Sequence, residues 1–396
     1  QAGVCLGDLE REANRFGLSL RASPTESLAF IGGAISTCAS GVRGFGYGSI
    51  RNYIKGLEIV LMTKDTINIK RGEILSKARE FDFKCKDKKF KFNLPTYQMP
   101  KVKSQAGYFI KDNMDLIDLF IGSEGTLGVI VCCEVMLQRM PFSVFDGLVF
   151  FKKEEAALSF VDKIKQLKKE NTLRPASLEF FDTNSLNLLK EEYSFIPDAD
   201  AAVYFEQEAQ TEENCNYLLE VWQNLIEQGS ALADKSILAD TSGEREKIFE
   251  FRHKLPQMIN ESLRLTKQVK TATDIAVPWQ NFRKMYDFYK TLACQSKIDY
   301  ANFGHIGENH LHFNFLPKND TQAKQAREYI MEFCRRAVSL GGTVSAEHGI
   351  GKIKKPYLKI MYNQQGIKEM AALKKYFDPH CLLGLDNIFD KELLSG

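Results

Sequence analysis

The chain has 396 residues, 44% hydrophobic and 26% charged, a balance that fits two or three globular domains and excludes a mainly disordered chain. The 53 Lys and Arg residues against 51 Asp and Glu residues give a net charge of +2, so nothing indicates nucleic-acid binding. No uninterrupted run of about 18 apolar residues is present, so we expect no membrane-spanning helix, and peripheral attachment to a membrane stays open.

The N-terminal part of the chain mixes short apolar segments with glycine clusters. The apolar spacing predicts a helix over residues 5–16 and buried strands over 57–62 and 128–136. The lysine-rich piece 85–92 (CKDKKFKF) is typical of a solvated hairpin or loop. Because Gln1 is not methionine and no signal-like segment follows it, we expect a fragment whose true start lies upstream. Nine cysteines without a CxxC pair predict the reduced thiols of a cytoplasmic protein.

Beyond Pro141 the pattern changes to alternating strands and helices. Strands are predicted over 148–151 and 201–205, and helices over 154–167, 212–229, 323–340 and 370–377. This alternation is typical of an α+β fold, so we place a domain boundary at 140/141.

Two glycine clusters offer backbone that a ligand can approach closely. Residues 32–48 contain six glycines, and residues 122–128 contain three in GSEGTLG. Such clusters cradle phosphates or a flat cofactor, or they form tight turns with no ligand. Neither cluster has the G-x-G-x-x-G spacing, and Gly351-Lys352 is not followed by Ser or Thr, so a standard NAD or ATP site is not expected.

Three histidines lie within eight residues in the run 304–314 (GHIGENHLHFN). Alternation places His310, His312 and Asn314 on one face of a strand, and Gly307 allows the chain to turn so that His305 points to the same place. Histidines gathered in this way suit a borderline metal such as zinc, manganese or iron.

A second polar group is the segment 345–351 (SAEHGIG). Glu347 could complete a His/His/Glu metal set, and His348 could act as a general base at neutral pH. Arg252, in FEFRHKLP, is either a salt-bridged helix residue or a bidentate clamp on a carboxylate.

Four segments of the chain together resemble a known family. Residues 31–61 and 119–130 are similar to its flavin-contacting segments, 304–314 to its metal and substrate strand, and 345–358 to its catalytic segment. Their order and spacing resemble the FAD-linked D-2-hydroxyacid dehydrogenases and oxidases, which include D-lactate dehydrogenases, D-2-hydroxyglutarate dehydrogenases and the flavin subunit of glycolate oxidase.

The resemblance implies an α+β fold of the vanillyl-alcohol-oxidase type. Residues 1–140 would form a PCMH-type FAD-binding domain whose pyrophosphate-loop subdomain lies upstream of Gln1. Residues 141–340 would form a substrate (cap) domain with an antiparallel sheet. Residues 341–396 would carry the catalytic Glu-His pair and return to the flavin domain.

The resemblance also implies roles for single residues. The metal ligands would be His305, His312 and Glu347, and the catalytic base would be His348. The substrate-binding residues would be Arg252, His310 and Asn314. The residues lining FAD would be Gly33, Thr37, Ala39, Gly41, Gly48, Gly122, Glu124, Gly125 and Ile130.

The sequence departs from the family pattern at two further places. The family commonly has Gly-Asp-Gly-Asn where this chain has Gly-Glu-Asn-His at 307–310, so His310 is an extra imidazole. The usual C-terminal Leu-Asn-Pro-Gly appears as Leu-Gly-Leu-Asp at 383–386, which removes an asparagine side chain near the flavin.

The activity implied is FAD-dependent oxidation of a small D-2-hydroxy acid such as D-lactate, glycolate or D-2-hydroxyglutarate. A divalent metal (Zn, Mn or Fe) would assist, and the Cα hydride would pass to flavin N5. The electron acceptor would be a quinone, an electron-transfer protein or an Fe–S subunit, and a homodimer is an open alternative. Two other functions stay open: an enzyme like alkylglycerone-phosphate synthase, and a non-catalytic subunit of a multi-subunit dehydrogenase.

Overall fold

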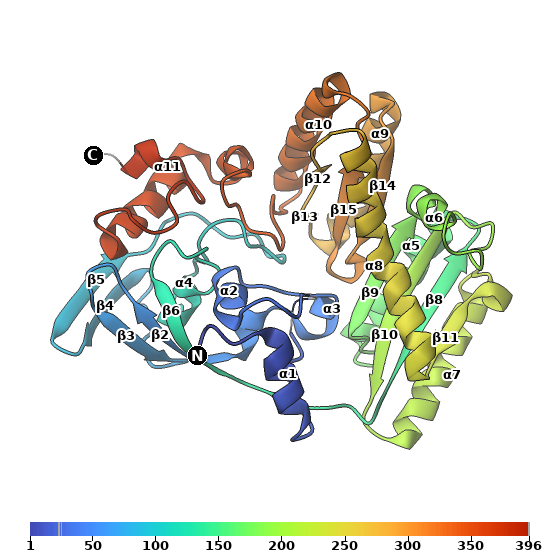
Figure 1. Cartoon of the computed structure of the whole chain (residues 1–396), viewed down its shortest axis with the longest axis horizontal. Helices are drawn as coiled ribbons and strands as arrows, with labels where there is room; N and C mark the ends of the chain where they lie inside the picture. Colours follow the sequence, from blue (N-terminus) through green and yellow to red (C-terminus); the bar gives the residue numbers. More distant parts are fainter. Residues whose placement is uncertain (23, 25, 395–396) are drawn as a thin grey trace. The chain divides into compact units, whose positions relative to one another are not determined.

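The computed structural model describes residues 1–22, 24 and 26–394, coloured along the chain in Figure 1. Its contacts divide the chain into two compact units. Unit 1 comprises Gln1–Gly41, Gly48–Met140 and Ala337–Gly396, and unit 2 comprises Val42–Tyr47 and Pro141–Arg336. The chain therefore leaves unit 1 twice and returns to it for its last segment.

Unit 1 contains three small antiparallel sheets. The largest has the strand order β3-β2-β6, and the other two are the pairs β4-β5 and β1-β7. The strands are β1 (Leu18–Ser19), β2 (Ile54–Val60), β3 (Thr66–Lys70), β4 (Glu80–Cys85), β5 (Lys88–Asn93), β6 (Val129–Val135) and β7 (Gln138–Arg139).

Short helices and one long helix complete unit 1. They are α1 (Leu6–Asn14), α2 (Ile31–Ser36), η1 (Ile50–Tyr53), α4 (Leu116–Phe120), α11 (Lys355–Phe377) and η4 (Lys391–Leu394). The backbone of α11 is kinked at Asn363, where φ is 50°. Its buried Lys374 pairs with Asp378 at 2.5 Å and donates to the carbonyl of Thr126 at 2.9 Å, which ties the helix to the turn of the second glycine cluster.

Unit 2 is built on one sheet, and all strand pairs in its described residues are antiparallel. The order is β11-β8-β10-β9-β14-β15-β12, and β13 also pairs with β15. The strands are β8 (Ser143–Phe151), β9 (Ser177–Asp182), β10 (Ala201–Ala209), β11 (Ile237–Ala239), β12 (Thr271–Ala272), β13 (Ile275–Ala276), β14 (Tyr300–Gly304) and β15 (His310–Phe315).

Helices cover both faces of this sheet. They are α3 (Gly44–Tyr47), α5 (Glu154–Lys169), α6 (Thr183–Leu189), α7 (Glu212–Gln228), η2 (Ala233–Lys235), α8 (Ser242–Leu265), α9 (Trp279–Ser296), η3 (Ile306–Glu308) and α10 (Asp320–Ser339). On one face, Phe251 of α8 packs on Phe181, and α6 joins the same core. On the other face, Tyr289 of α9 and Phe333 of α10 pack on Phe313.

Alternation along the strands therefore decides which side chains face α8. Phe313 of β15 faces α9 and α10, so its neighbours His312 and Asn314 face the other way. In β9, Phe180 contacts Tyr286 of α9, so Glu179 points to the α8 face. The polar residues of the candidate site thus share one face of the sheet with α8.

Most elements predicted from the sequence are present. The helices predicted over 154–167 and 212–229 correspond to α5 and α7, and the strand predicted over 128–136 corresponds to β6. The strand predicted over 57–62 lies slightly earlier in the chain, because β2 begins at Ile54 and ends at Val60. The last predicted helix, 370–377, is only the C-terminal part of α11.

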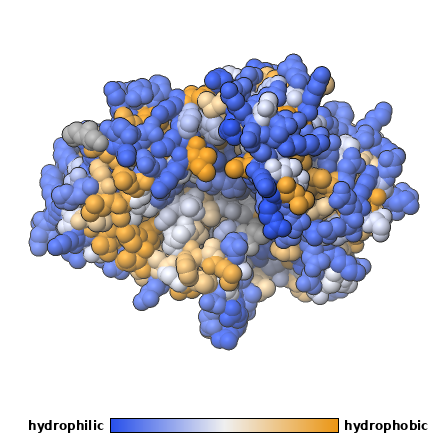
Figure 2. All heavy atoms as spheres, turned by 45° about the horizontal axis from the view of Figure 1, so that its top comes forward, coloured by the Kyte–Doolittle hydropathy of each residue, from blue (hydrophilic) through white to orange (hydrophobic). Residues whose placement is uncertain are grey.

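None of the helices in the described part of the chain is long and apolar enough to cross a membrane. Figure 2 shows hydrophilic residues over most of the face that it draws, with hydrophobic residues in smaller groups between them.

A buried charge cluster lies on β8 and β10. Asp146 and Glu206 are directly opposite each other, and Arg43 donates to both oxygens of Glu206 at 2.5 and 2.9 Å. Arg245 lies 3.4 Å from Asp146. Burial and the neighbouring Glu206 carboxylate together raise the pKa of Asp146 to about 7.

This pKa gives a pH-dependent contribution to stability. Because folding raises the pKa of Asp146, the stabilisation by its proton is present at low pH and is lost as pH rises through about 7. Asp146→Asn mimics the protonated form, so it is expected to raise the free energy of unfolding by about 2–4 kcal/mol at pH 8 and to have little effect at pH 4.

Tryptophan fluorescence during urea unfolding measures this effect, because both tryptophans of the chain, Trp222 and Trp279, lie in unit 2. The exposed Asp234→Asn serves as the control and is expected to show no such pH dependence. An equal effect of Asp146→Asn at both pH values would contradict the raised pKa.

Candidate active site

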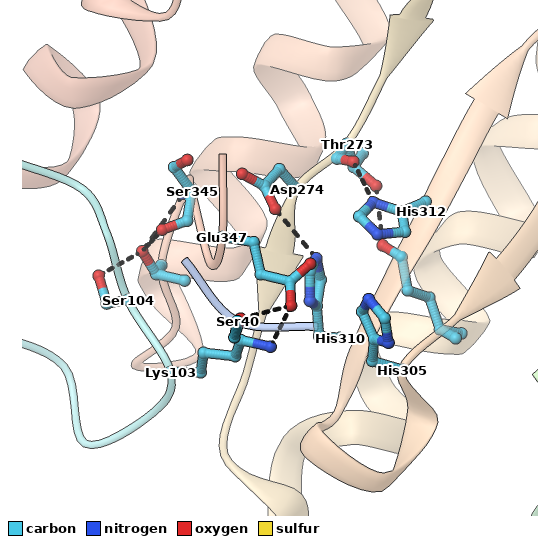
Figure 3. A network of polar contacts seen from close by, with 12 residues as sticks. Ser40, Lys103, Ser104, Thr273, Asp274, His305, His310, His312, Ser345 and Glu347 are labelled. Atoms are coloured by element: carbon cyan, nitrogen blue, oxygen red, sulfur yellow. Dashed lines mark hydrogen bonds and ion pairs between the residues drawn. The ribbon is translucent and has the colours of Figure 1, made fainter. Parts of the chain in front are cut away.

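Three imidazoles gather where β14 turns into β15 (Figure 3). Gly304, with φ 127°, and the single turn η3 bring His305 back beside His310 and His312. The ring centroids of His310 and His312 are 4.5 Å apart, and that of His305 lies 5.4 and 5.5 Å from them. One ring nitrogen of each histidine lies within 4.8 Å of those of the other two. The sequence-based prediction that these histidines meet is therefore confirmed.

Glu179 connects this group to α8. Its Oε1 lies 2.6 Å from His305 Nδ1, and its carboxylate accepts two hydrogen bonds from Arg252, at 2.8 and 3.3 Å. Burial alone would raise the pKa of Glu179, but the charge of Arg252 and the hydrogen bonds from His305 and Arg252 outweigh it and hold the pKa well below its usual range. Glu179 is therefore an ionised carboxylate that fixes both partners.

The other two imidazoles have partners on the segment 273–274. His312 Nδ1 lies 3.3 Å from the carbonyl oxygen of Thr273, and His310 Nε2 lies 3.0 Å from Asp274 Oδ1. Thr273 is itself held on β15, because its backbone N–H donates to Phe313 and its hydroxyl accepts from the Phe313 N–H. The histidines are thus oriented by residues of one rigid sheet region.

Asn314 lies further along the same strand and is fully buried. Its Nδ2 donates to the carbonyl oxygen of His312 at 2.8 Å. The role predicted for it in substrate binding stays a prediction, as does that of Arg252, whose guanidinium is paired with Glu179.

In unit 1, the first part of the 32–48 glycine cluster lies against the second cluster although about 90 residues separate them. The N–H of Gly122 donates to Ile35, and the N–H of Glu124 donates to Ser36. A Cβ added at Gly33 or Gly125 would meet nothing within 4 Å, so the backbone here borders open space. Such an open glycine surface fits the approach of a flat cofactor.

The other predicted flavin residues are held around this surface. Thr37 donates to the carbonyl of Gly33 at 3.1 Å, and Ala39 donates its N–H to the carbonyl of Ala34 and accepts the N–H of Ile50. Gly48 has φ 71°, and Ile130 of β6 pairs with Ile59 of β2. Their contact with FAD stays a prediction.

The segment with the predicted catalytic residues also lies in unit 1. Glu347 accepts a hydrogen bond from Ser40 at 2.6 Å and is paired with Lys103 (Figure 3). His348 is exposed, and Ser345 donates to the carbonyl of Gly349 at 2.7 Å, which closes the loop on itself. The roles predicted for Glu347 and His348 in metal binding and proton transfer stay predictions.

Glu124 connects the flavin motif to this catalytic segment. Its carboxylate accepts the backbone N–H groups of Ile350 and Gly351, both at 2.7 Å. Gly349, with φ 67°, leaves the necessary room, because a Cβ there would lie 2.6 Å from the Glu124 carboxylate. Burial raises the pKa of Glu124, and these two hydrogen bonds oppose that increase.

We expect Glu124→Gln to loosen the catalytic segment. An amide offers one accepting oxygen, so one of the two N–H groups loses its partner at a cost of about 1.5–3 kcal/mol. The amides of Ile350 and Gly351 should then exchange with solvent at least about 10-fold faster in hydrogen-exchange measurements. Glu134→Gln, at an exposed position of unit 1, is the control, and equal exchange in the two variants would contradict the role of Glu124.

The residues present fit both groups that the resemblance implies. The backbone of unit 1 is open at Gly33 and Gly125, as the approach of a flat cofactor requires, and the imidazoles of unit 2 are donors that bind zinc and similar ions. Sequence analysis did not identify Glu179 or Asp274. The signal available for Glu179 was a charged residue between the apolar residues Leu178 and Phe180 in the strand 177–182 (SLEFFD).

Comparison with known families gives two matches. The model described as "FAD linked oxidases, C-terminal domain" matches residues 146–384, which is more than half of the chain, and the model described as "FAD binding domain" matches residues 1–69. The matched regions contain the histidine strand and the first glycine cluster.

Curated relatives cover nearly the whole chain. The "Glycolate oxidase subunit GlcD" of Bacillus subtilis is 29% identical over 99% of this chain and 75% of its own length. A D-lactate dehydrogenase of Anaerostipes hadrus is 26% identical over 97% of this chain and 74% of its own length. A D-2-hydroxyglutarate dehydrogenase of Stutzerimonas stutzeri is 26% identical over 98% of this chain and 76% of its own length.

Among solved structures, an alkyldihydroxyacetonephosphate synthase superposes with a TM-score of 0.62 at 16% identity. The match covers 97% of this chain and 62% of the synthase chain. At this identity the likeness shows the fold alone, and together with the two family matches it confirms the predicted fold class.

Proposed function

Because this chain belongs to the family of FAD-linked oxidases and is an oxidoreductase, we propose that it oxidises a small D-2-hydroxy acid to the 2-oxo acid. The observation that carries the proposal is the convergence of three imidazoles beside the Glu179–Arg252 pair on one face of the unit 2 sheet. A cation held by imidazoles next to a guanidinium is suited to a ligand that has both a hydroxyl and a carboxylate.

In this proposal Arg252 binds the substrate carboxylate. Glu179 engages its Nε and one terminal nitrogen, which fixes the plane of the guanidinium and leaves further N–H donors for an anion. His348 removes the proton of the substrate hydroxyl, because an imidazole is a base near neutral pH.

Two bound groups complete the proposed site. A divalent cation held by His305 and His312, with Glu347 as the further predicted ligand, supplies Lewis acidity that lowers the pKa of the substrate hydroxyl. FAD, when bound, supplies the redox chemistry. We further propose that the flavin is reoxidised by a quinone, an electron-transfer protein or a partner subunit. The name of the Bacillus relative, "Glycolate oxidase subunit GlcD", indicates partner subunits for that protein.

The alternatives from the sequence receive less support. The likeness to the synthase concerns the fold only. The three imidazoles give no support to a synthase-like function. A purely non-catalytic subunit receives less support, because the matched family and the D-lactate dehydrogenase relative are oxidoreductases.

The test is a visible spectrum of the protein expressed from its complete reading frame, before and after anaerobic addition of D-lactate, glycolate or D-2-hydroxyglutarate. We expect a yellow protein whose flavin absorbance is bleached by one of these acids and not by its L-enantiomer, where one exists. A flavin that none of them bleaches, or a protein that does not take up FAD, would contradict the proposed function.

A further inference from the structure

An extra imidazole sits where the family commonly has asparagine. We infer that His310 is a metal ligand rather than a substrate-binding residue. Together with His305 and His312 it forms a three-histidine site for a borderline cation such as Zn²⁺ or Co²⁺, made entirely by unit 2. The inference deepens the metal part of the proposed function and rests on it.

The backbone places the three rings for convergence. His310 and His312 are two residues apart on β15 and therefore project from the same face, and η3 returns His305 to that face. Nitrogens bound to zinc at about 2.0–2.1 Å in a tetrahedron lie roughly 3.4 Å apart. The donor atoms here already lie within 4.8 Å of one another, so small side-chain rotations suffice to bind an ion.

Two of the rings have the hydrogen-bond pattern of metal ligands. His305 directs Nδ1 at the Glu179 carboxylate, and His312 directs Nδ1 at the carbonyl of Thr273. Each partner accepts a hydrogen bond from Nδ1–H, which leaves the lone pair on Nε2. Outer carboxylates and carbonyls fix the tautomer and orientation of metal-binding histidines in this way.

The third ring, that of His310, has no exposed surface. Nε2 is 3.0 Å from Asp274 Oδ1, yet neither ring nitrogen makes a well-aligned hydrogen bond to the described residues. Buried polar atoms are normally satisfied, so this ring indicates a missing ligand. An ion bound to Nδ1, with Nε2–H donating to Asp274, would satisfy both nitrogens.

Charge and donor type indicate which ion would bind. Three neutral imidazoles carry no charge, and the Glu179 charge is already matched by Arg252, so Asp274 is the nearby carboxylate that offsets a divalent cation. Nitrogen donors favour zinc and cobalt over manganese and magnesium. Replacing His310 by asparagine, the residue common in the family, should therefore weaken Zn²⁺ and Co²⁺ binding more than Mn²⁺ binding.

The first experiment measures metal affinity directly. Chelator-treated protein from the complete reading frame is dialysed against Co²⁺ or Zn²⁺, and bound metal is determined by elemental analysis. We expect His310→Asn and His310→Gln to weaken binding at least about 100-fold, more than the loss of an outer partner alone. Glu347→Ala removes the further proposed ligand but leaves the three imidazoles, so it should weaken binding less than the His310 variants do.

The control is His380→Asn, an exposed histidine of the C-terminal segment, which should bind metal as the wild type does. Wild-type affinity in both His310 variants would overturn the inference. Circular dichroism shows whether each variant is folded before its affinity is compared.

A second measurement uses the wild type and does not depend on any variant folding. X-ray absorption of the zinc-loaded protein counts the imidazoles on the metal, and three are expected, whereas two would overturn the inference. A protein that oxidises a hydroxy acid with two imidazoles per zinc contradicts the inference and leaves the proposed function intact. Three imidazoles without any hydroxy-acid oxidation support the inference and contradict the proposed function.

Discussion

Replacing His348 with alanine is expected to slow flavin reduction by the D-2-hydroxy acid roughly 100- to 10,000-fold, because the proposed general base is lost. His348 is exposed on the segment that Glu124 and Ser345 hold in place, so its truncation should leave the fold intact. Anaerobic stopped-flow absorbance of the flavin measures the rate. FAD content of the variant, measured first, separates a loss of chemistry from a loss of cofactor.

The matched control is His380→Ala, which removes an exposed imidazole outside the catalytic segment and should reduce flavin at the wild-type rate. Added imidazole should restore part of the rate in the His348 variant, because a small base can enter an exposed site. Unchanged reduction in His348→Ala would remove this residue from the mechanism.

The sequence predicted those elements whose pattern is both periodic and strongly apolar. The helix α5 shows apolar residues at 157, 158, 161 and 164, and the alternation in β15 located the histidine strand and its faces. The helix α8 was not predicted, although Ile248, Phe251 and Leu255 have helical spacing. Its many charged residues and the internal Pro256 weaken the helical pattern in the sequence.

In the candidate site, the sequence likewise predicted the residues that are close together in the chain and not those that are far apart. Histidines close in sequence could be grouped by strand alternation alone, and the structure confirms that they meet. Glu179 lies more than 120 residues before His305, and only the pairing of β9 with β14 brings the two together. Contacts of this kind depend on sheet order, which periodicity does not encode.

Arg252 illustrates why charge alone did not decide a role. The sequence allowed either a salt-bridged helix residue or a carboxylate clamp, and the structure shows the ion pair with Glu179. The two roles are compatible, because a guanidinium has five N–H donors and Glu179 accepts from two nitrogens. The ion pair therefore orients the group that we propose for substrate binding.

The ion pair also leads to the largest effect expected on stability. Glu179→Ala leaves the Arg252 guanidinium without its carboxylate in a largely buried position, which should lower the free energy of unfolding by about 3–5 kcal/mol. Because folding depresses the pKa of Glu179, the stabilisation is present above about pH 5 and is lost as pH falls. Tryptophan fluorescence during urea unfolding at pH 7 reports the change in unit 2.

A double-mutant cycle separates this pair from general damage to the core. Arg252→Ala should cost a similar amount, and Glu179→Ala combined with Arg252→Ala should cost clearly less than the sum, because no buried charge is then left alone. Lys254→Ala, on the same helix and paired with Glu192 at a more exposed position, should cost less than about 1 kcal/mol. If the two single costs simply add, Glu179 and Arg252 are not coupled, and Glu179 cannot be the residue that orients the guanidinium.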